Sequence, residues 1–294
     1  MTSAIRTFSL LAPAKLNLYL RVVGKRPDDY HELETVFERL DLADELTFDD
    51  APREILLSCS HPSLSCGEDN LVMQTARLLQ RATGTTRGAR MHLEKRIPVA
   101  AGLGGGSSDA ATTLIGLDRL WKTNCSAQQL HELAAQLGSD VPVFLIDAPF
   151  AIGRGRGELL EPVEVTTVLH HVLVTPNVPL STKEMFAEAD FNLTAVRPSS
   201  TIVVHALRNG SLGELAQALW NDLAPAAIRR CPLIQEIQRG LLDAGCLGAG
   251  MSGSGPSVFG LCGDRQQAET IARQMQQRFA AWFVRVVRTF HNPL

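Results

Sequence analysis

The sequence lacks the features that mark several large classes of protein. Its 28 Lys and Arg residues are balanced by 31 Asp and Glu residues, and no long run of like charge occurs, so it has no basic stripe for nucleic-acid binding. No stretch approaches the roughly 18 uninterrupted apolar residues of a membrane span, and the apolar patch at residues 8–12 is too short for a signal peptide. We therefore expect a cytoplasmic protein without nucleic-acid or membrane partners.

The cysteines lack the spacing of a metal site. The six residues are scattered, and no CxxC pair occurs. Cys59, His61 and Cys66 are close in sequence, but a zinc site would need more ligands at regular spacing. We expect free thiols in a reducing compartment, and we assign no protein ligand to a metal ion.

Hydrophobic patterns divide the 294 residues into strands and helices without a regular βαβα alternation, which favours an α+β fold. Strands are predicted at 8–10, 16–23, 45–48, 55–58, 91–97, 141–146, 151–157, 168–175, 257–262 and 282–289. Helices are predicted at 70–82, with Asp69 as N-cap, and at 110–121, 126–137, 212–220, 233–244 and 265–277. We predict two domains, at 1–160 and 161–294.

A glycine-rich loop at residues 98–109 precedes one predicted helix. Four of the five residues from 102 to 106 are glycine, so consecutive backbone N–H groups can converge without a Cβ in the way. The helix N-terminus adds unpaired donors and the positive end of a dipole. Ser107 and Ser108 add hydroxyls that can reach a phosphate oxygen or Mg²⁺. The loop therefore predicts a binding site for a di- or triphosphate.

Neither common nucleotide loop is present. The glycine-rich loop has no lysine after its last glycine, so it is not a Walker A loop. Residues 248–253 match GxGxxG, but the following apolar run at 257–261 has strand character, whereas a dinucleotide fingerprint must open a helix. A dehydrogenase is therefore disfavoured. A tight hairpin and a small-residue turn that closes on a ligand both remain open.

Two charged residues stand at the heads of apolar runs. Lys15 precedes the predicted strand at 16–23, and Asp140 precedes the run at 141–146. Ionised groups in such places are either solvated edges or paired site residues. Their positions alone do not separate these readings.

Three blocks together resemble the motifs of the GHMP kinase superfamily: residues 13–18, 98–111 and 248–255. Residues 29–33 and 138–142 resemble a branch whose acceptor is a cytidine diphosphate-linked polyol, and the likeness weakens between about 149 and 215. The resemblance implies two α+β lobes, the N-terminal one like ribosomal protein S5 domain 2 and the C-terminal one ferredoxin-like. It also implies ATP- and Mg²⁺-dependent phosphorylation of the polyol 2-hydroxyl in the non-mevalonate isoprenoid route.

Site roles follow from the same resemblance. Asp140 would be the base for the acceptor hydroxyl, with Lys15 beside it to steady charge, and Asn17 would contact the polyol. The residues that would bind ATP are Pro98, Gly102, Leu103, Gly104, Gly105, Gly106, Ser107 and Ser108 around the phosphates, and Asn70 and Leu71 around adenine.

The cytosine site is implied in the same way. Tyr30 and Phe186 would sandwich the base, His31 would hydrogen-bond its edge, and Thr182 would line the pocket.

Several charged or titratable residues receive no such role. Asp109 is as well explained by a place in the first helical turn as by Mg²⁺ binding, so it is not assigned to metal. Arg154 and Arg156 are taken as turn residues, and His170 and His171 as structural.

Two alternatives to this function stay open. One is another GHMP kinase for a small alcohol, of homoserine or mevalonate type. The other is a non-catalytic ligand sensor on the same fold, although a sensor need not keep a proton acceptor.

Overall fold

The computed structural model describes residues 7–28, 30–189, 191 and 198–291. The chain forms two compact units that interleave along the sequence. Unit 1 comprises Met1–Ala14, Leu42–Ile97 and Gly104–Ile146, and unit 2 comprises Lys15–Asp41, Pro98–Leu103 and Asp147–Leu294. Two long strands, β1 (Phe8–Lys25) and β2 (His31–Ala51), contribute to both units. The predicted domain boundary at residue 160 stays a prediction.

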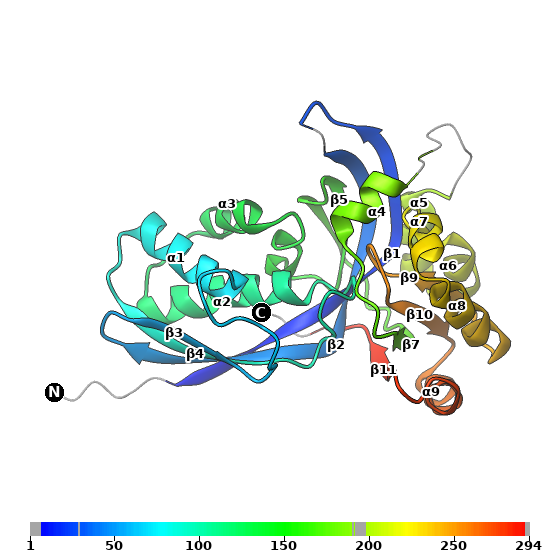
Figure 1. The fold of residues 1–294 in the computed structure, drawn as a ribbon. Helices are drawn as coiled ribbons and strands as arrows, with labels where there is room; N and C mark the ends of the chain where they lie inside the picture. The colour runs from blue at the N-terminus through cyan, green and yellow to red at the C-terminus, as the bar shows by residue number, and fades with distance from the viewer. Residues whose placement is uncertain (1–6, 29, 190, 192–197, 292–294) are drawn as a thin grey trace. The chain divides into compact units, whose positions relative to one another are not determined.

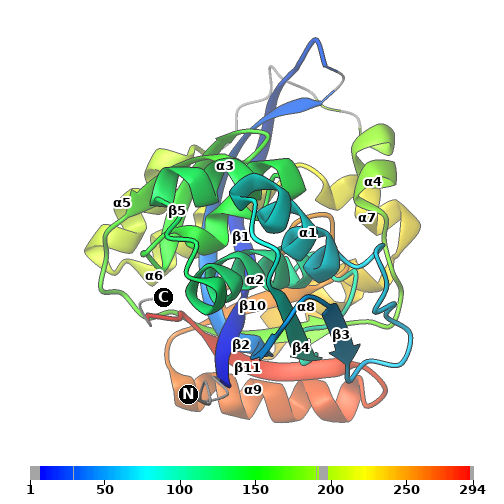
Figure 2. The ribbon, with the colours of Figure 1, turned by 90° about the vertical axis from the view of Figure 1, so that its left-hand side faces the viewer.

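Unit 1 packs three helices against a sheet. Its other elements are β3 (Ile55–Cys59), α1 (Leu71–Thr83), β4 (Gly88–Glu94), α2 (Gly105–Trp121), α3 (Ala127–Leu137) and the 3₁₀-helix η1 (Pro142–Leu145). Strand β4 pairs parallel with β3 and antiparallel with the second half of β2. The three α-helices lie on one side of β3 and β4 (Figures 1 and 2).

The starts of α1 and α2 differ from the sequence prediction. The N-cap of α1 is Asn70 rather than Asp69, because the Asn70 side chain accepts a hydrogen bond from the Val72 amide at 2.9 Å. Helix α2 begins at Gly105, five residues earlier than predicted, after Gly104 in the left-handed conformation (φ 70°). Part of the glycine-rich loop is therefore the first turn of a helix.

The strand predicted at 141–146 is wrong. Residues Pro142–Leu145 form the 3₁₀-helix η1. Proline holds φ near the helical value and has no N–H to donate, so it suits the start of a helical turn. Val143 and Phe144 are buried, so the apolar run reflects burial and carries no strand period.

Unit 2 contains a four-stranded antiparallel sheet of order β11–β7–β10–β9, formed by β7 (His170–Thr175), β9 (Gly248–Met251), β10 (Val258–Cys262) and β11 (Phe283–Arg288). This order is that of a ferredoxin-like fold. Helices α8 (Leu233–Asp243) and α9 (Arg265–Arg278) contribute buried side chains to the core beside this sheet. The predicted ferredoxin-like C-terminal part and the α+β class are confirmed.

The remaining elements of unit 2 are β5 (Phe150–Gly155), β6 (Leu159–Val163), α4 (Thr182–Glu188), α5 (Ser200–Asn209), α6 (Leu212–Ala218), β8 (Trp220–Asn221) and α7 (Ala224–Arg230). The predicted helix at 212–220 ends at Ala218, because Trp220 and Asn221 pair with Tyr19 and Leu20 of β1. Helices α4, α5 and α7 have no counterpart among the predictions.

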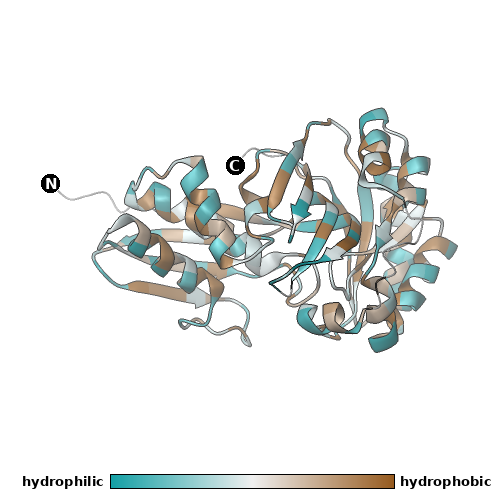
Figure 3. Ribbon diagram, turned by 90° about the horizontal axis from the view of Figure 1, so that it is seen from above, coloured by the Kyte–Doolittle hydropathy of each residue, from teal (hydrophilic) through white to brown (hydrophobic). Residues whose placement is uncertain are grey.

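The helices of both units are amphipathic. Figure 3 shows them with brown, hydrophobic stretches next to teal, hydrophilic ones. In α8, for example, Ile234, Ile237 and Leu241 are fully buried at helical spacing. Among the described residues, no helix combines the length and the apolar character needed to cross a membrane.

His171 belongs to the core of unit 2. Its Nε2 lies 2.8 Å from a carboxylate oxygen of Glu38, and the other oxygen accepts a hydrogen bond from the Thr289 hydroxyl at 2.7 Å. All three side chains are buried. The contacts agree with a structural role for His171.

Candidate active site

Strand β1 presents Lys15 and Asn17 on one face, because side chains two residues apart in a strand point the same way. Both residues are only 3% exposed. Lys15 Nζ donates to Asn17 Oδ1 at 2.6 Å, and Asn17 Nδ2 donates to the Thr35 hydroxyl on β2 at 2.8 Å. A buried cation is therefore held beside an amide whose orientation is fixed by its own partner.

Ser252 joins the three sequence blocks that resembled kinase motifs. Its hydroxyl donates to the Gly102 carbonyl at 2.9 Å and accepts from the backbone N–H of Asn17 at 3.3 Å. The Lys15 amide donates to the Leu103 carbonyl at 2.9 Å. Segments far apart in sequence thus meet around one small hydroxyl residue.

This junction requires glycine. Gly102 has φ 75°, and a Cβ added there would lie 2.2 Å from the Ser252 carbonyl oxygen. A Cβ at Gly253 would lie 3.2 Å from Lys15 Nζ. The hairpin expected as one alternative for residues 248–255 is present: strands β9 and β10 form it, and its connection lies against residue 102 and Lys15. That this turn closes on a ligand stays a prediction. A dinucleotide fingerprint is excluded, because a strand follows.

The backbone N–H groups in the first turn of α2, in unit 1, are not capped by a side chain. Gly104 provides no side chain to cap the helix. A Cβ at Gly106 would meet nothing within 4 Å, and Ser107 is half-buried. The amide groups of the first turn have no intrahelical acceptor. They are therefore suited to bind an anion.

Asp140, Asn70 and Leu71 also belong to unit 1 and are each half-buried. Asp140 stands between the end of α3 and η1. The Asn70 side chain caps α1 and also donates to the Ser65 carbonyl at 2.6 Å. The predicted catalytic role of Asp140 and the predicted adenine contacts stay predictions.

The structure brings His31 and Phe186 together. Their rings stack with centroids 5.2 Å apart at 21°, and Phe191 meets His31 edge-on at 5.0 Å. Phe191, which the sequence prediction missed, carried no motif that would have indicated it. Burial, followed by the charge of Lys25, lowers the pKa of His31. This shift favours the neutral imidazole, which offers one donor and one acceptor.

Tyr30 lies in a different environment from its neighbour in sequence. It is 56% exposed, and the guanidinium of Arg156 lies over its ring with Cζ 5.0 Å from the centroid. The predicted sandwich of a base between Tyr30 and Phe186 stays a prediction, since in this structure His31 faces Phe186.

Thr182 connects the aromatic residues His31 and Phe186 to the sequence block at residues 248–255. Its hydroxyl lies 2.8 Å from that of Ser254. Thr182 and Phe186 are four residues apart on α4, so they share one helix face.

Asp109 is buried in an ion pair. Its carboxylate accepts from Lys95 at 2.8 Å, and Lys95 also pairs with Asp44. Burial raises the pKa of Asp109 to about 7, against the opposing effect of Lys95. The partners of Lys95 are 14 and 51 residues away in the sequence.

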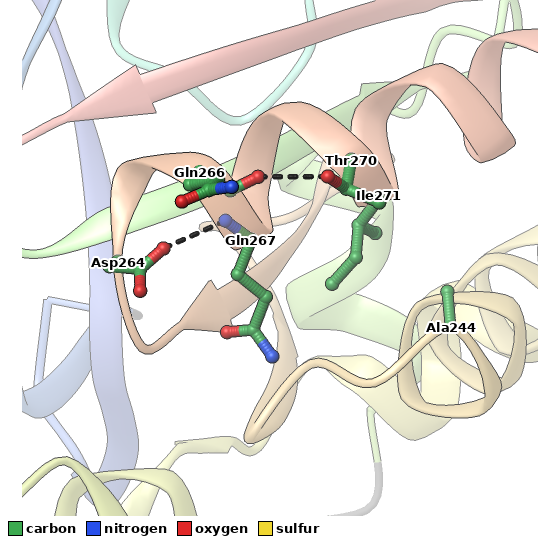
Figure 4. A pocket seen from close by; sticks show the side chains of 6 residues that line it. All are labelled: Ala244, Asp264, Gln266, Gln267, Thr270 and Ile271. Atoms are coloured by element: carbon green, nitrogen blue, oxygen red, sulfur yellow. Dashed lines mark hydrogen bonds between the residues drawn. The ribbon is translucent and has the colours of Figure 1, made fainter.

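A pocket beside α9 contains none of these residues (Figure 4). It is lined by Ala244, Asp264, Gln266, Gln267, Thr270 and Ile271. The Asp264 carboxylate caps α9 by accepting from the Gln267 amide at 2.8 Å, and the Thr270 hydroxyl donates to the Gln266 carbonyl at 3.0 Å. These polar contacts belong to the helix itself.

The part of the chain that the structure describes contains no group of three or more His, Cys, Asp or Glu side chains arranged to hold a metal ion.

Comparison with known proteins identifies the family. Residues 70–151 match the family model "GHMP kinases N terminal domain", and residues 203–281 match "GHMP kinases C terminal". A 4-diphosphocytidyl-2-C-methyl-D-erythritol kinase from Pelotomaculum thermopropionicum is 43% identical over 96% of this chain and 98% of its own length.

Solved structures agree. A 4-(cytidine 5'-diphospho)-2C-methyl-D-erythritol kinase superposes with a TM-score of 0.80 at 34% identity, covering 95% of this chain and 99% of the other. Homoserine kinase from Cytophaga hutchinsonii superposes with a TM-score of 0.76 over 99% and 96% of the two chains, but its 18% identity supports the fold alone. The predicted GHMP kinase fold is confirmed, and the chain belongs to the GHMP family of small-molecule kinases.

Proposed function

We propose that the chain transfers the γ-phosphoryl group of ATP to the 2-hydroxyl of 4-diphosphocytidyl-2-C-methyl-D-erythritol, a step of the non-mevalonate isoprenoid pathway. The names of its relatives give the acceptor. The observation that carries the proposal is that the backbone amides of Lys15 and Asn17 bond to Leu103 and Ser252, while Ser252 bonds to Gly102, because these contacts hold β1 beside the glycine-rich loop.

The nucleotide half of the proposal rests on the first turn of α2. Its amides are not capped by a side chain, and the space beside Gly106 is open. A helix N-terminus of this kind stabilises phosphate oxygens through N–H donors and the dipole. Mg²⁺ would arrive with ATP and neutralise charge on its phosphates. No side chain is assigned to it.

The acceptor half assigns the chemistry to two residues. Phosphoryl transfer needs aligned groups, neutralised charge and an acceptor for the hydroxyl proton. We assign proton acceptance to Asp140 and charge stabilisation to Lys15, with Asn17 orienting the polyol. Lys15 suits this role because it is buried and because Asn17 restricts its ammonium group.

Recognition of cytosine is assigned to the aromatic residues. We propose that Tyr30 and Phe186 stack on the base and that neutral His31 reads its edge. The 2.8 Å contact between Thr182 and Ser254 would keep α4 beside the turn that contacts Lys15.

We propose that the reaction takes place in the cytoplasm, which cell fractionation would test.

The decisive experiment is ³¹P NMR of the products after incubation with ATP, Mg²⁺ and the cytidyl polyol. A new phosphate monoester signal together with ADP is expected. Homoserine and mevalonate are tested in parallel as acceptors. If either of them yields a monoester and the cytidyl polyol yields none, that alcohol is the acceptor and the cytidyl polyol is not. ATP binding without any product would indicate a sensor.

Asp140→Asn tests the base. We expect turnover to fall by about 10²- to 10⁴-fold, with ATP affinity retained. The control is Asp243→Asn, the same substitution at an exposed position on α8, which should leave both unchanged. Wild-type turnover in Asp140→Asn would remove this residue from the mechanism.

A further inference from the structure

Lys95 occupies a buried position between two carboxylates. It follows β4 directly, and its side chain is 4% exposed. The ammonium group pairs with Asp44 of β2 and with Asp109 of α2, the latter at 2.8 Å. Both carboxylates are also almost completely buried. One cation therefore connects a strand to the beginning of the helix that carries the last part of the glycine-rich loop.

The strand end of this bridge is rigid. A carboxylate oxygen of Asp44 accepts from the backbone amides of Arg96 at 2.5 Å and Ile97 at 2.8 Å. Asp44 thus holds both the side chain of Lys95 and the backbone of the two residues after it. The position of the ammonium group is therefore defined by the sheet.

At the helix side of the bridge, the first turn of α2 lies against the Lys95 side chain. A Cβ added at Gly105 would lie 3.3 Å from Lys95 Nζ and 3.2 Å from Ile97 Cγ2. Ser108 Oγ and Asp109 Oδ1 are buried without a hydrogen-bond partner among the described residues. The contact between Asp109 Oδ2 and Lys95 is therefore a principal polar attachment of this turn.

Stability alone is a weak explanation for this arrangement. Desolvating an ion pair costs about as much as the pairing returns, and apolar side chains of similar volume often stabilise a core as well or better. Two buried carboxylates around one lysine are more costly still. What such a bridge supplies is a defined geometry, and the element that it fixes is the turn whose amides would face phosphate.

We propose that Lys95 is a positioning residue for the nucleotide: by bridging Asp44 and Asp109, it fixes the first turn of α2 in the orientation that binds the phosphates of ATP. This inference rests on the proposed function, because it takes ATP as the ligand of that turn. Lys95 acts through the helix and does not touch the reacting atoms.

The chain offers a control at the other end of the same helix, where the anchoring cation is more exposed than Lys95. Arg87 pairs with Asp50 at 2.8 Å and donates to the carbonyls of Leu120 and Trp121 at 3.1 and 3.3 Å. Arg87 therefore anchors the C-terminal end of α2, as Lys95 anchors its beginning. Lys95→Met and Arg87→Met each remove one anchoring cation and keep an unbranched apolar chain.

The test is calorimetric titration of wild type and both variants with MgATP, below the melting temperature of each, together with acceptor KM values. We expect Lys95→Met to weaken MgATP binding by about 10- to 100-fold, since small displacements of positioning groups have effects of this size. Its acceptor KM should stay within about twofold, and Lys95→Arg should recover part of the affinity because it restores the charge. Arg87→Met should lower the melting temperature and leave MgATP affinity unchanged.

Each outcome decides the question. Equal MgATP affinity in Lys95→Met and wild type, or an equal loss in Arg87→Met, overturns the positioning role. If Lys95→Met does not fold, Asp109→Ala removes the same attachment to the helix while the pair of Lys95 with Asp44 remains, and unchanged affinity there overturns it too. A wild-type protein that fails to bind MgATP overturns the proposed function and this inference with it, which separates the two failures.

Discussion

Two glycines of the same loop, Gly102 and Gly106, should respond in opposite ways to one added methyl group. Gly102 has φ 75°, and its added Cβ would lie 2.2 Å from the Ser252 carbonyl oxygen and 3.0 Å from that of Gly255. Both neighbours are backbone atoms, which cannot rotate away as a side chain can. Gly106 lies in the first turn of α2, where the new Cβ would meet nothing within 4 Å.

The magnitudes follow from these surroundings. Placing alanine in the left-handed region costs about 1–2 kcal/mol, and forcing the backbone of an overpacked site apart costs about 1–3 kcal/mol more. Gly102→Ala should therefore lower the free energy of unfolding by about 2–5 kcal/mol. Gly106→Ala should leave it unchanged or raise it by up to about 1 kcal/mol, because alanine favours a helix over glycine.

Urea unfolding and MgATP titration of the two variants check this reasoning. The open space at Gly106 is where we propose that phosphate lies, so Gly106→Ala should be at least as stable as wild type and still lose MgATP affinity. If this variant binds MgATP normally, phosphate does not lie against Gly106. If Gly102→Ala is as stable as wild type, the close approach of the loop to Ser252 is not a constraint on the fold.

The remaining predictions concern the acceptor pocket and pH. In steady-state kinetics, Tyr30→Ala should raise KM for the cytidyl substrate with little effect on KM for ATP, while Tyr30→Phe keeps the ring and should resemble wild type. If Tyr30→Ala weakens ATP binding instead, Tyr30 belongs to the nucleotide site and not to the acceptor pocket. The pKa of Asp109 is raised to about 7 from an ordinary value of 3.8. Its proton therefore stabilises the folded state fully below pH 3.8, and this contribution is lost as pH rises towards 7. Urea unfolding from pH 4 to 8 should show a smaller decline in Asp109→Asn than in wild type, by up to a few kcal/mol, and equal declines would contradict the raised pKa.

Local signals in the sequence were sufficient for the elements whose pattern is set by burial on one face. Helix α1 repeats apolar residues at helical spacing, and the structure places it within one residue of the predicted range. The run at 141–146 failed because a fully buried segment is apolar whatever its backbone conformation. Glycine obscured the start of α2, since it disfavours helices in general, and tertiary contacts decided the outcome.

The candidate site was predictable only where a motif marked it. The three blocks around Ser252 could be named from the sequence, but their hydrogen bonds join residues as far apart as Asn17 and Ser252. The stacking of His31 on Phe186 and the bridge of Lys95 to Asp44 depend on topology in the same way. The residues next to a lysine in the sequence do not indicate that it will be buried and paired with a carboxylate from a distant strand.

The interleaving of the two units has a consequence for biosynthesis. The segment Lys15–Asp41, which carries Lys15, Asn17 and His31, belongs to unit 2, whose remaining residues come mostly from Asp147–Leu294. Within this segment β1 and β2 are neighbours in the sheet, and its other strand partners are β5 and the short strand β8, whose Trp220 pairs with Tyr19. On the ribosome this segment therefore emerges early, but it can pair with β5 and β8 only after residues 155 and 221 have been made. Unit 1 has all of its residues once position 146 has emerged, so a nascent chain would complete the proposed nucleotide-binding turn well before the strand that bears Lys15 is fully paired.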